Sequence, residues 1–487
     1  MKAANSKRIA VSFTLFFVFS FFVFSILFFF FPSADKNLKI ICRSLTKVML
    51  IGIDDTDSNE GMCTTYLAAF LADKLKVYGT VVGFPYLIRL NPSIPYKTRG
   101  NAALGIDLNL RSGDISVRND VIKTVTDTIE EYAELSCEKT NPGAVFVFEE
   151  AYEEMCRPLN DFFKKAVTDV IEIDEAVFLL EKYQKKSDSS VSYFSLKNGR
   201  GLIGALAVCG AMLNSDWEAT YEYLAYRKPE NWGSNGGPDR FVDTGSLIEA
   251  DCQTFPETWD TIDSSKKSKP FPVCVPGAND PVLFGIRGNS PEAVLKAASL
   301  VVSEEIERFC VFKTNQGTDA HLIRIQSVDE MLPLRSYILD CAVHSESETI
   351  SGGHDLFSVR DSAGNILKCA AYEPTGDFRK IIRQLLPGDE ITIFGSFKNE
   401  TLNLEKIKIN QLVSKLRFEN PICPSCQSKM ESSGENQGFR CRKCKTKADK
   451  KIEIEIQRKL RLGYYEVPPS ARRHLSKPLI RYSKDEL

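Results

Sequence analysis

The hydrophobic pattern from residue 48 onward alternates between short apolar runs and a stretch with helical periodicity. Leu67, Phe70, Leu71 and Leu75 recur at the spacing of one helix face, which predicts a helix over 64–78. Short apolar runs on either side of it predict buried strands. These runs cover residues 48–53, 80–90, 102–110 and 143–148. Strands that alternate with helices predict an α/β or α+β domain, which we expect to span residues 49–170.

Three further units follow along the chain. Residues 171–332 contain Gly199-Arg200-Gly201-Leu202-Ile203-Gly204, which opens a helical stretch over 205–212. Residues 333–415 hold five short strand-like runs, which predict a small β-barrel, with an OB-fold as the leading expectation. The runs are 336–344, 355–360, 365–372, 390–396 and 402–409. Residues 416–487 combine a cysteine cluster with a basic tail.

An uncharged run of 23 residues, 9–31, precedes these units and holds eleven of the chain's 31 phenylalanines. As a helix it would span roughly 35 Å, enough to cross a bilayer. The terminal Lys-Asp-Glu-Leu also matches an ER-retention signal. The run is equally typical of translated upstream DNA with U-rich codons, and Met49 stands directly before a strong domain start. We favour Met49 as the natural start of a cytoplasmic protein without a stable membrane partner; a membrane anchor through residues 9–31 is the alternative.

Composition places the chain among folded globular proteins. It has 487 residues, of which 43% are hydrophobic and 26% charged, and these values exclude a disordered chain, a fibrous protein and a small disulfide scaffold. Charge is unevenly distributed: residues 411–487 hold 18 Lys and Arg against 9 Asp and Glu, whereas residues 1–410 hold 44 against 55. A basic tail on an acidic body indicates either a polyanionic partner such as nucleic acid or a solvated charged surface.

The cysteines fall into two groups. Ten of the fourteen are scattered singly, which is typical of buried thiols in a reducing compartment. Cys423-x-x-Cys426 and Cys441-x-x-Cys444 are separated by fourteen residues. Each pair fits a tight turn that directs two thiolates at one ion, so the four predict a zinc ribbon with a closed, structural Zn²⁺ site rather than a redox pair. Lys and Arg around the second pair favour a nucleic-acid partner.

A second chemical signal follows the first predicted strand. Asp54, Asp55 and Asp57 place three carboxylates within four residues. Their repulsion is most easily offset by a divalent cation, and oxygen ligands suit Mg²⁺. The small residues that follow, among them Thr64 and Thr65, would let backbone N–H groups and a helix N-terminus approach phosphates. The pattern is therefore a candidate Mg²⁺–nucleotide site, and an acidic turn with a helix cap is the structural alternative.

A basic loop follows the next predicted strand. Lys97 and Arg99, in Pro95-Tyr96-Lys97-Thr98-Arg99-Gly100, would face phosphates across the carboxylate site; a solvated basic loop is the alternative. The segments around Arg200 and over 314–319 are expected to be structural turns. The four histidines show no metal-binding spacing.

The motifs occur in an order that resembles one known family. They are 52–58 (GIDDTDS), 61–67 (GMCTTYL), 89–92 (RLNP), 94–101 (IPYKTRGN), 140–143 (TNPG), 199–205 (GRGLIGA), 226–233 (YRKPENWG), 285–288 (GIRG), 313–319 (KTNQGTD), the four ribbon cysteines and 472–479 (RRHLSKPL). Together they resemble the archaeal tRNA(Ile) 2-agmatinylcytidine synthetases. The resemblance covers residues 49 to about 482 and leaves out residues 1–48.

The resemblance implies a multidomain α+β architecture: a kinase-like α/β catalytic domain, a ferredoxin-like domain, an OB-fold β-barrel and a zinc ribbon, assigned to 49–170, 171–332, 333–415 and 416–487. It also implies an ATP-dependent C–N ligase that attaches agmatine to C2 of the wobble cytidine in a tRNA(Ile) with a CAU anticodon. The γ-phosphate of ATP would activate the C2 oxygen, and the agmatine amine would displace it. The target base would leave the anticodon stack to be reached.

The resemblance also implies residue roles. Asp54, Asp55 and Asp57 would hold Mg²⁺ on the ATP phosphates, or one would act as a base, and Thr64 would become phosphorylated during turnover. Thr65, Lys97 and Arg99 would bind the cofactor. Two other functions remain open on the residues: an OB-fold and ribbon protein that only binds nucleic acid, and a tRNA-dependent kinase that uses another amine.

Overall fold

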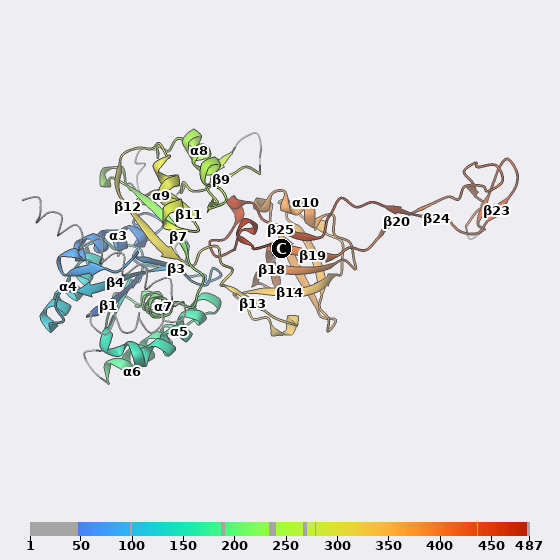
Figure 1. Cartoon of the computed structure of the whole chain (residues 1–487). Coiled ribbons are helices and arrows are strands. Elements are labelled where there is room, and N and C mark those ends of the chain that lie inside the picture. Colours follow the sequence, from blue (N-terminus) through green and yellow to red (C-terminus); the bar gives the residue numbers. More distant parts are fainter. Residues whose placement is uncertain are drawn as a thin grey trace, which may run out of the picture.

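The computed structural model describes residues 47–97, 100–186, 190–232, 240–265, 270–277, 279–435 and 437–484. Three parts follow one another in space: a body of sheet and helices, a β-barrel, and an arm that ends in a small ribbon (Figure 1). No helix in the described part of the chain combines the length and the apolar character that crossing a bilayer requires. The apolar run over 9–31 lies outside the described residues.

One sheet of ten strands forms the centre of the body, in the order β6-β5-β1-β4-β3-β12-β7-β11-β8, with β2 paired to β4. Its two halves meet where β3 pairs with β12 in parallel, so the sheet runs through residues from both predicted body units. The strands are β1 Val48–Asp54, β2 Gly79–Val81, β3 Tyr86–Arg89, β4 Ala102–Leu110, β5 Gly143–Phe148, β6 Val191–Ser195, β7 Thr220–Arg227, β8 Thr258–Trp259, β11 Val282–Gly288 and β12 Ile306–Thr314.

The strand predicted over 80–90 is two short strands in the structure, β2 and β3. Gly83, at φ 67°, lies between them in the left-handed region, so the extended backbone cannot continue through it. Both pieces pair with β4, but at different positions along it. The prediction of a strand is therefore correct for each piece, and its continuity over 80–90 is wrong.

Helices cover both faces of the sheet, which explains why β1 is apolar at every position. Leu50 packs on the side of α5, α6 and α7, whereas Ile51 and Ile53 pack on the side of α3 and α4. Helix α7 touches the sheet closely, because a Cβ at Gly52 would lie 2.0 Å from the carbonyl oxygen of Ala205. The body helices are α3 Thr64–Lys74, α4 Ile115–Tyr132, α5 Tyr152–Thr168, α6 Ile173–Gln184, α7 Gly201–Leu213, α8 Thr244–Thr254 and α9 Pro291–Ser299.

The five strand-like runs of the third unit form a closed barrel. β14 pairs with β18 and β16, β18 with β19, β19 with β17, and β17 with β16, so the ring closes on itself. Val359, Ile393 and Ile407 are among its fully buried core residues. The five strands are β14 Arg335–Val343, β16 Asp355–Arg360, β17 Ile366–Ala371, β18 Glu390–Lys398 and β19 Thr401–Gln411. The short strand β13 Leu322–Arg324 pairs beside β14, β15 Glu348–Thr349 beside β16, and α10 Phe378–Ile382 lies between β17 and β18.

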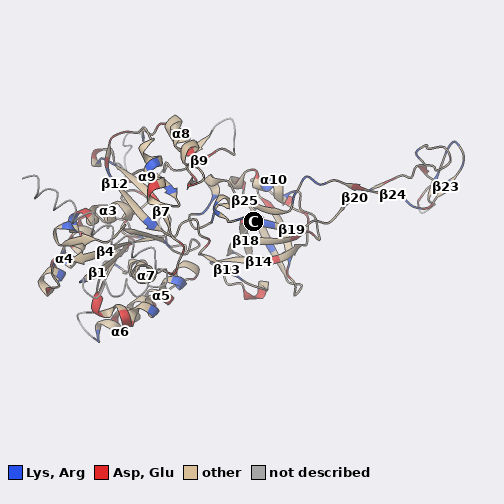
Figure 2. Cartoon of the chain, viewed as in Figure 1, with Lys and Arg blue, Asp and Glu red and all other residues tan. Residues whose placement is uncertain are grey.

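Beyond the barrel, β20 Lys415–Glu419 and β24 Ile452–Ile456 form an antiparallel arm that carries the ribbon away from the body (Figure 1). The ribbon contains three short strands, β21 Glu431–Ser432, β22 Phe439–Arg440 and β23 Lys447–Ala448. Lys, Arg and acidic residues are scattered over the arm and the ribbon (Figure 2). The chain then returns through β25 Gly463–Glu466, which pairs with β19 of the barrel.

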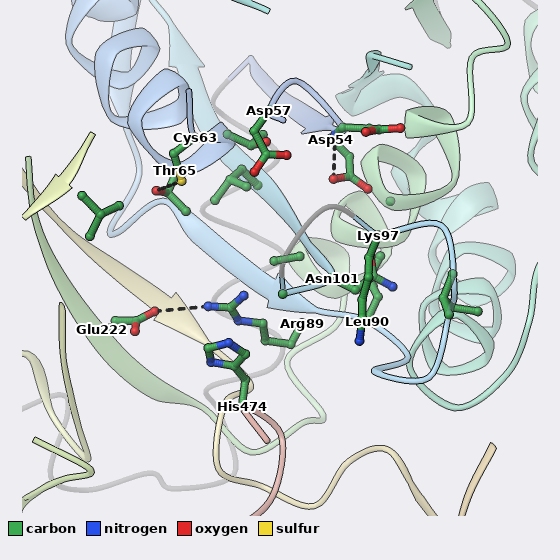
Figure 3. A pocket seen from close by; sticks show the side chains of 18 of the residues that line it. Asp54, Asp57, Cys63, Thr65, Arg89, Leu90, Lys97, Asn101, Glu222 and His474 are labelled. Carbon is green, nitrogen blue, oxygen red and sulfur yellow. Dashed lines mark hydrogen bonds and ion pairs between the residues drawn. The ribbon is translucent and has the colours of Figure 1, made fainter. Parts of the chain in front are cut away.

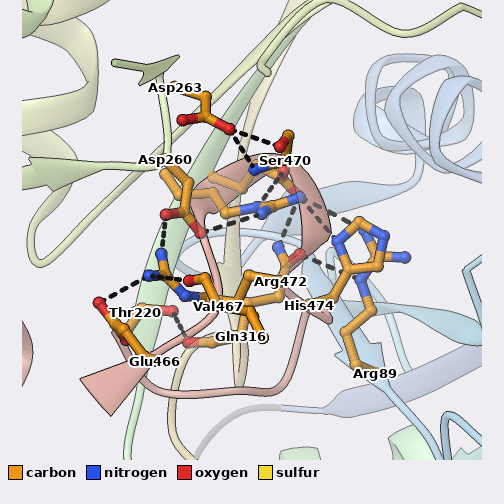
Figure 4. A network of polar contacts seen from close by, with 12 residues as sticks. Arg89, Thr220, Asp260, Asp263, Gln316, Glu466, Val467, Ser470, Arg472 and His474 are labelled. Carbon is orange, nitrogen blue, oxygen red and sulfur yellow. Dashed lines mark hydrogen bonds and ion pairs between the residues drawn. The ribbon is translucent and has the colours of Figure 1, made fainter. Parts of the chain in front are cut away.

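Residues 467–482, here called the C-terminal segment, lie between the barrel and the body. They contain two 3-10 turns, η6 Pro469–Ala471 and η7 Leu479–Arg481. Arg472 reaches Asp260 of the body and lies 2.7 Å from Glu466 (Figure 4). On the barrel side, the fully buried Lys406 donates to Asp319 at 2.6 Å and to the carbonyl of Lys477 at 2.8 Å. These buried contacts fix the two parts relative to one another.

Candidate active site

A cavity of about 400 Å³ lies in the body, beside the C-terminal segment (Figure 3). Its lining comes from parts of the chain that are distant in sequence: the end of β1, the start of α3, the end of β3, the start of α7, strands β7 and β11, and the C-terminal segment. The polar side chains of the lining include Asp54, Asp55, Asp57, Thr64, Thr65, Arg89, Lys97, Arg200, Glu222, Asp260, Arg287 and His474.

The three predicted aspartates all line this cavity. Asp54 ends β1 and approaches α7 so closely that a Cβ at Gly204 would lie 1.9 Å from its Oδ2 atom. Asp55 has φ 59°, and its N–H donates to Oδ1 of Asp54 at 2.7 Å. Burial, together with the other carboxylates, raises the pKa of Asp54 well above its usual value and that of Asp55 to about 6. Crowded negative charge is therefore a property of the folded site.

A divalent cation would relieve this crowding. Within the described ranges, only the four ribbon cysteines bring at least three ligand atoms within 4.8 Å of one another, so the three aspartates do not converge on one point. Mg²⁺, however, is commonly held by one or two carboxylates together with substrate phosphates. The aspartates fit that mode of binding.

The start of α3 places two threonines in the cavity. The hydroxyl of Thr56 donates to Oγ1 of Thr64 at 3.1 Å, and both residues are buried. Oγ1 of Thr65 lies 3.0 Å from Sγ of Cys63, the N-cap residue, which forms no side-chain cap on the helix. The first N–H groups of α3 thus have no capping side chain at the edge of the cavity, where the helix dipole favours an anion.

The basic loop is only partly described. Lys97 lines the cavity, and its Nζ donates to the carbonyl of Pro92. Burial and the nearby cations Arg473, Lys398 and Arg89 lower the pKa of Lys97. Arg99 lies outside the described residues. Lys97 therefore sits among like charges at the cavity, as expected for a group that awaits an anionic ligand.

Other lining residues were not predicted as site residues. Nε of Arg89 donates to Gln316 at 3.1 Å, and its Nη2 lies 3.8 Å from Glu222. Burial lowers the pKa of Arg89 to about 10, against the effect of Glu222. The guanidinium of Arg200 stacks 4.1 Å from the ring centroid of Tyr96. An arginine that ends an apolar run, as Arg89 does, was the available sequence signal.

The segment over 314–319, expected to be a structural turn, does hold strands together. Asn315 exchanges hydrogen bonds of 2.8 and 2.9 Å with the backbone of Arg89. Gln316, fully buried, donates to Glu222 at 2.6 Å. The turn therefore also fixes the charged groups on this side of the cavity.

The ribbon cysteines converge far from the cavity, at the end of the arm. Sγ of Cys423 lies 3.1 Å from Sγ of Cys444, and Sγ of Cys426 lies 3.4 Å from that of Cys441 and 3.6 Å from that of Cys444. Tetrahedral Zn²⁺ with Zn–S bonds of about 2.3 Å sets sulfurs roughly 3.8 Å apart, so the group fits a structural zinc with little adjustment.

Three family models match the chain: "TiaS TCKD domain" over residues 50–189, "TiaS FLD domain" over 199–321 and "TiaS C-terminal zinc ribbon domain" over 420–460. The tRNA(Ile) 2-agmatinylcytidine synthetase TiaS of Methanosarcina acetivorans is 53% identical over 434 residues, which cover 89% of this chain and 97% of that protein. The corresponding protein of Methanocaldococcus jannaschii is 42% identical over 437 residues, with 89% and 98% covered.

Solved structures agree over the same length. The complex of TiaS with its isoleucine tRNA and ATP has a TM-score of 0.80 at 44% identity, and the complex with tRNA, AMPCPP and agmatine has a TM-score of 0.78 at 42% identity. Each comparison covers 91% of this chain and 99% of the other. The similarity thus includes the body, the barrel and the ribbon, and the chain belongs to the tRNA(Ile) 2-agmatinylcytidine synthetase (TiaS) family.

Proposed function

We propose that the protein is an ATP-dependent ligase that attaches agmatine to C2 of the wobble cytidine of a tRNA(Ile) with a CAU anticodon. Relatives with this name match the chain over nearly their whole length, and related structures hold an isoleucine tRNA, ATP or its analogue, and agmatine. The observation that carries the proposal to residues is the cavity, where three aspartates and two threonines face Arg89 and Lys97.

The reaction needs a better leaving group at C2, because a carbonyl oxygen leaves poorly. Transfer of the γ-phosphoryl group to the C2 oxygen provides one. The primary amine of agmatine then forms a bond to C2, the C2–O bond breaks, and phosphate leaves with the bonding electron pair. Mg²⁺ held by the aspartates would neutralise charge on the ATP phosphates during the transfer.

The protein groups have separable tasks in this proposal. Asp54 and Asp55, whose pKa values are raised, could accept a proton where the cation leaves one of them free. Thr64, at the uncapped start of α3, is the proposed acceptor of a phosphoryl group during turnover. Lys97, Arg99 and Thr65 would bind nucleotide phosphates. The wobble base would leave the anticodon stack to enter the cavity.

The finer architecture belongs to the same proposal. The part of the body over 49–170 would be the kinase-like catalytic domain, 171–332 the ferredoxin-like domain, 333–415 an OB-fold and 416–487 the ribbon with its basic tail. The closed five-stranded barrel supports the OB-fold assignment. A tRNA substrate favours action in the cytoplasm.

The direct test uses purified full-length protein, ATP, labelled agmatine and a tRNA(Ile) transcript with a CAU anticodon. We expect label in the tRNA, and none in a transcript whose wobble C is replaced by U. Label that enters only with another amine would indicate the alternative kinase, and tight tRNA binding without transfer of any amine would indicate a binding protein. With γ-labelled ATP, Thr64→Ala should abolish protein-bound phosphate while the fold is retained.

A further inference from the structure

His474 enters the cavity from the C-terminal segment, and its hydrogen bonding fixes which ring nitrogen carries the proton. Nδ1 of His474 lies 2.7 Å from Nη2 of Arg287. A guanidinium only donates hydrogen bonds, so Nδ1 must be the acceptor. Burial and the cations Arg89 and Arg287 lower the pKa of His474 well below its usual value, so the ring is neutral. The single ring proton therefore lies on Nε2.

That Nε2–H donor does not stand alone. A Cβ at Gly100 would lie 2.5 Å from Nη1 of Arg89 and 3.0 Å from Nε2 of His474. The space kept open by the missing side chain thus lies between two donors. Neither donor atom is hydrogen-bonded to another residue in the described part of the chain. A neutral donor and a cationic donor on one small space are suited to a ligand oxygen.

We propose that His474 and Arg89 form a two-donor subsite over Gly100 that receives an oxygen of the RNA substrate, so that His474 is a substrate-positioning residue. The assignment rests on the proposed function. It adds a task for the C-terminal segment, which otherwise only joins the barrel to the body.

The position of the subsite favours the RNA over the nucleotide. His474 and Arg89 lie across the cavity from Asp54 and Asp57 (Figure 3), where the metal and the ATP phosphates are expected. His474 also belongs to the stretch of chain that returns from the ribbon through β25 on the barrel. The basic ribbon and the barrel are the parts expected to hold tRNA, so the subsite faces the side from which the RNA arrives.

Two substitutions at His474 separate this task from simple support of Arg287. His474→Gln places an amide N–H near the position of Nε2 but removes the Nδ1 acceptor, whereas His474→Asn keeps an acceptor near Nδ1 and removes the Nε2 donor. We would measure the Kd for tRNA by filter binding, the KM for tRNA and for ATP, and the Tm of each variant.

His474→Gln should bind tRNA within about twofold of wild type, whereas His474→Asn should weaken tRNA binding about five- to tenfold, the size expected for one lost hydrogen bond. The KM for ATP should change less than twofold in both. Gly100→Ala, which fills the space between the donors, should weaken tRNA binding like His474→Asn, and it covers the case in which a His474 variant does not fold.

The opposite order, with Asn near wild type and Gln impaired, would show that His474 acts only through Arg287 and would overturn the proposal. So would equal tRNA affinities in all variants, or a loss confined to ATP. Because Kd is measured without turnover, the affinity pattern can be read even if wild-type protein transfers no agmatine, an outcome that would count against the proposed function instead.

Discussion

The cavity and the ribbon differ in how far apart in the sequence their functional residues lie. The four ribbon ligands fall within residues 423–444, whereas the cavity draws on residues from Asp54 to His474. One bound ion and two tight turns define the ribbon, so its geometry is local. The cavity holds crowded charges that only the complete fold keeps in place. The ribbon should therefore fail when its ion is lost, and the cavity when its charge balance changes.

The largest expected effect is on the charge of the cavity. Asp57→Asn or Asp55→Asn keeps the shape of the side chain and removes one negative charge from the proposed metal site. Loss of charge stabilisation on a transferring phosphoryl group costs several kcal/mol of barrier, so agmatine incorporation should fall at least about a hundredfold. Affinity for tRNA should stay near wild type. Glu60→Gln, at an exposed acid of the same loop, is the matched control, and near-native rates in both aspartate variants would refute the site.

A smaller effect is expected from the ribbon. Cys423→Ser or Cys444→Ser removes one of four zinc ligands and should lower bound zinc from about one equivalent per chain towards zero. Affinity for tRNA should drop tenfold or more, while hydrolysis of ATP by the body is affected much less. Metal analysis and tRNA binding check both statements. Cys252→Ser, at an exposed single thiol, should change neither, and zinc-free wild-type protein that was never exposed to a chelator would contradict the assignment.

The cavity should also show a cost in stability that the ribbon lacks. The pKa of Asp55 is raised from 3.8 to about 6, so the folded state binds a proton that the unfolded state has released between about pH 4 and 6. Stability from this group therefore falls as pH rises through that window. In EDTA at pH 7, Asp55→Asn should be more stable than wild type by up to about 3 kcal/mol. Denaturant unfolding at pH 7 and pH 4 tests this, since the difference should shrink at the lower pH.

The smallest effect should come from the part of the chain that belongs to neither region. A protein that begins at Met49 should retain agmatine incorporation within about twofold, because β1 pairs with β4 and β5 from Met49 onward. The same assay on full-length protein is the reference. Activity that requires residues 1–48 and sediments with membranes would instead support the anchor.

Local patterns predicted most of the elements, for a physical reason. The five barrel runs and the helix at Thr64 depend on periodicity within a few residues, and the ribbon depends on the spacing of Cys423 to Cys444. The exception, the break at Gly83, arises where a left-handed glycine interrupts an apolar run. The apolar run alone could not reveal it.

The cavity was predictable only where its residues are neighbours in sequence. Asp54, Asp55, Asp57 and Thr64 could be grouped because they flank one strand end. Arg287 and His474 lie 187 positions apart yet meet at 2.7 Å, and no local pattern connects them. Such contacts are set by the pairing of β12 with β3 and by the return of the chain from the arm.

The path of the C-terminal segment also sets the order in which the protein can become active during synthesis. The aspartates, the threonines of α3 and the whole body sheet leave the ribosome before the barrel and the ribbon, and His474 follows only after the ribbon has been made. Until then the early part of the chain carries its acidic cluster without the groups that complete the cavity. A chain whose translation stops after the ribbon would thus hold folded parts and a zinc ion but an incomplete cavity, which protects the cell from partly made enzyme that consumes ATP.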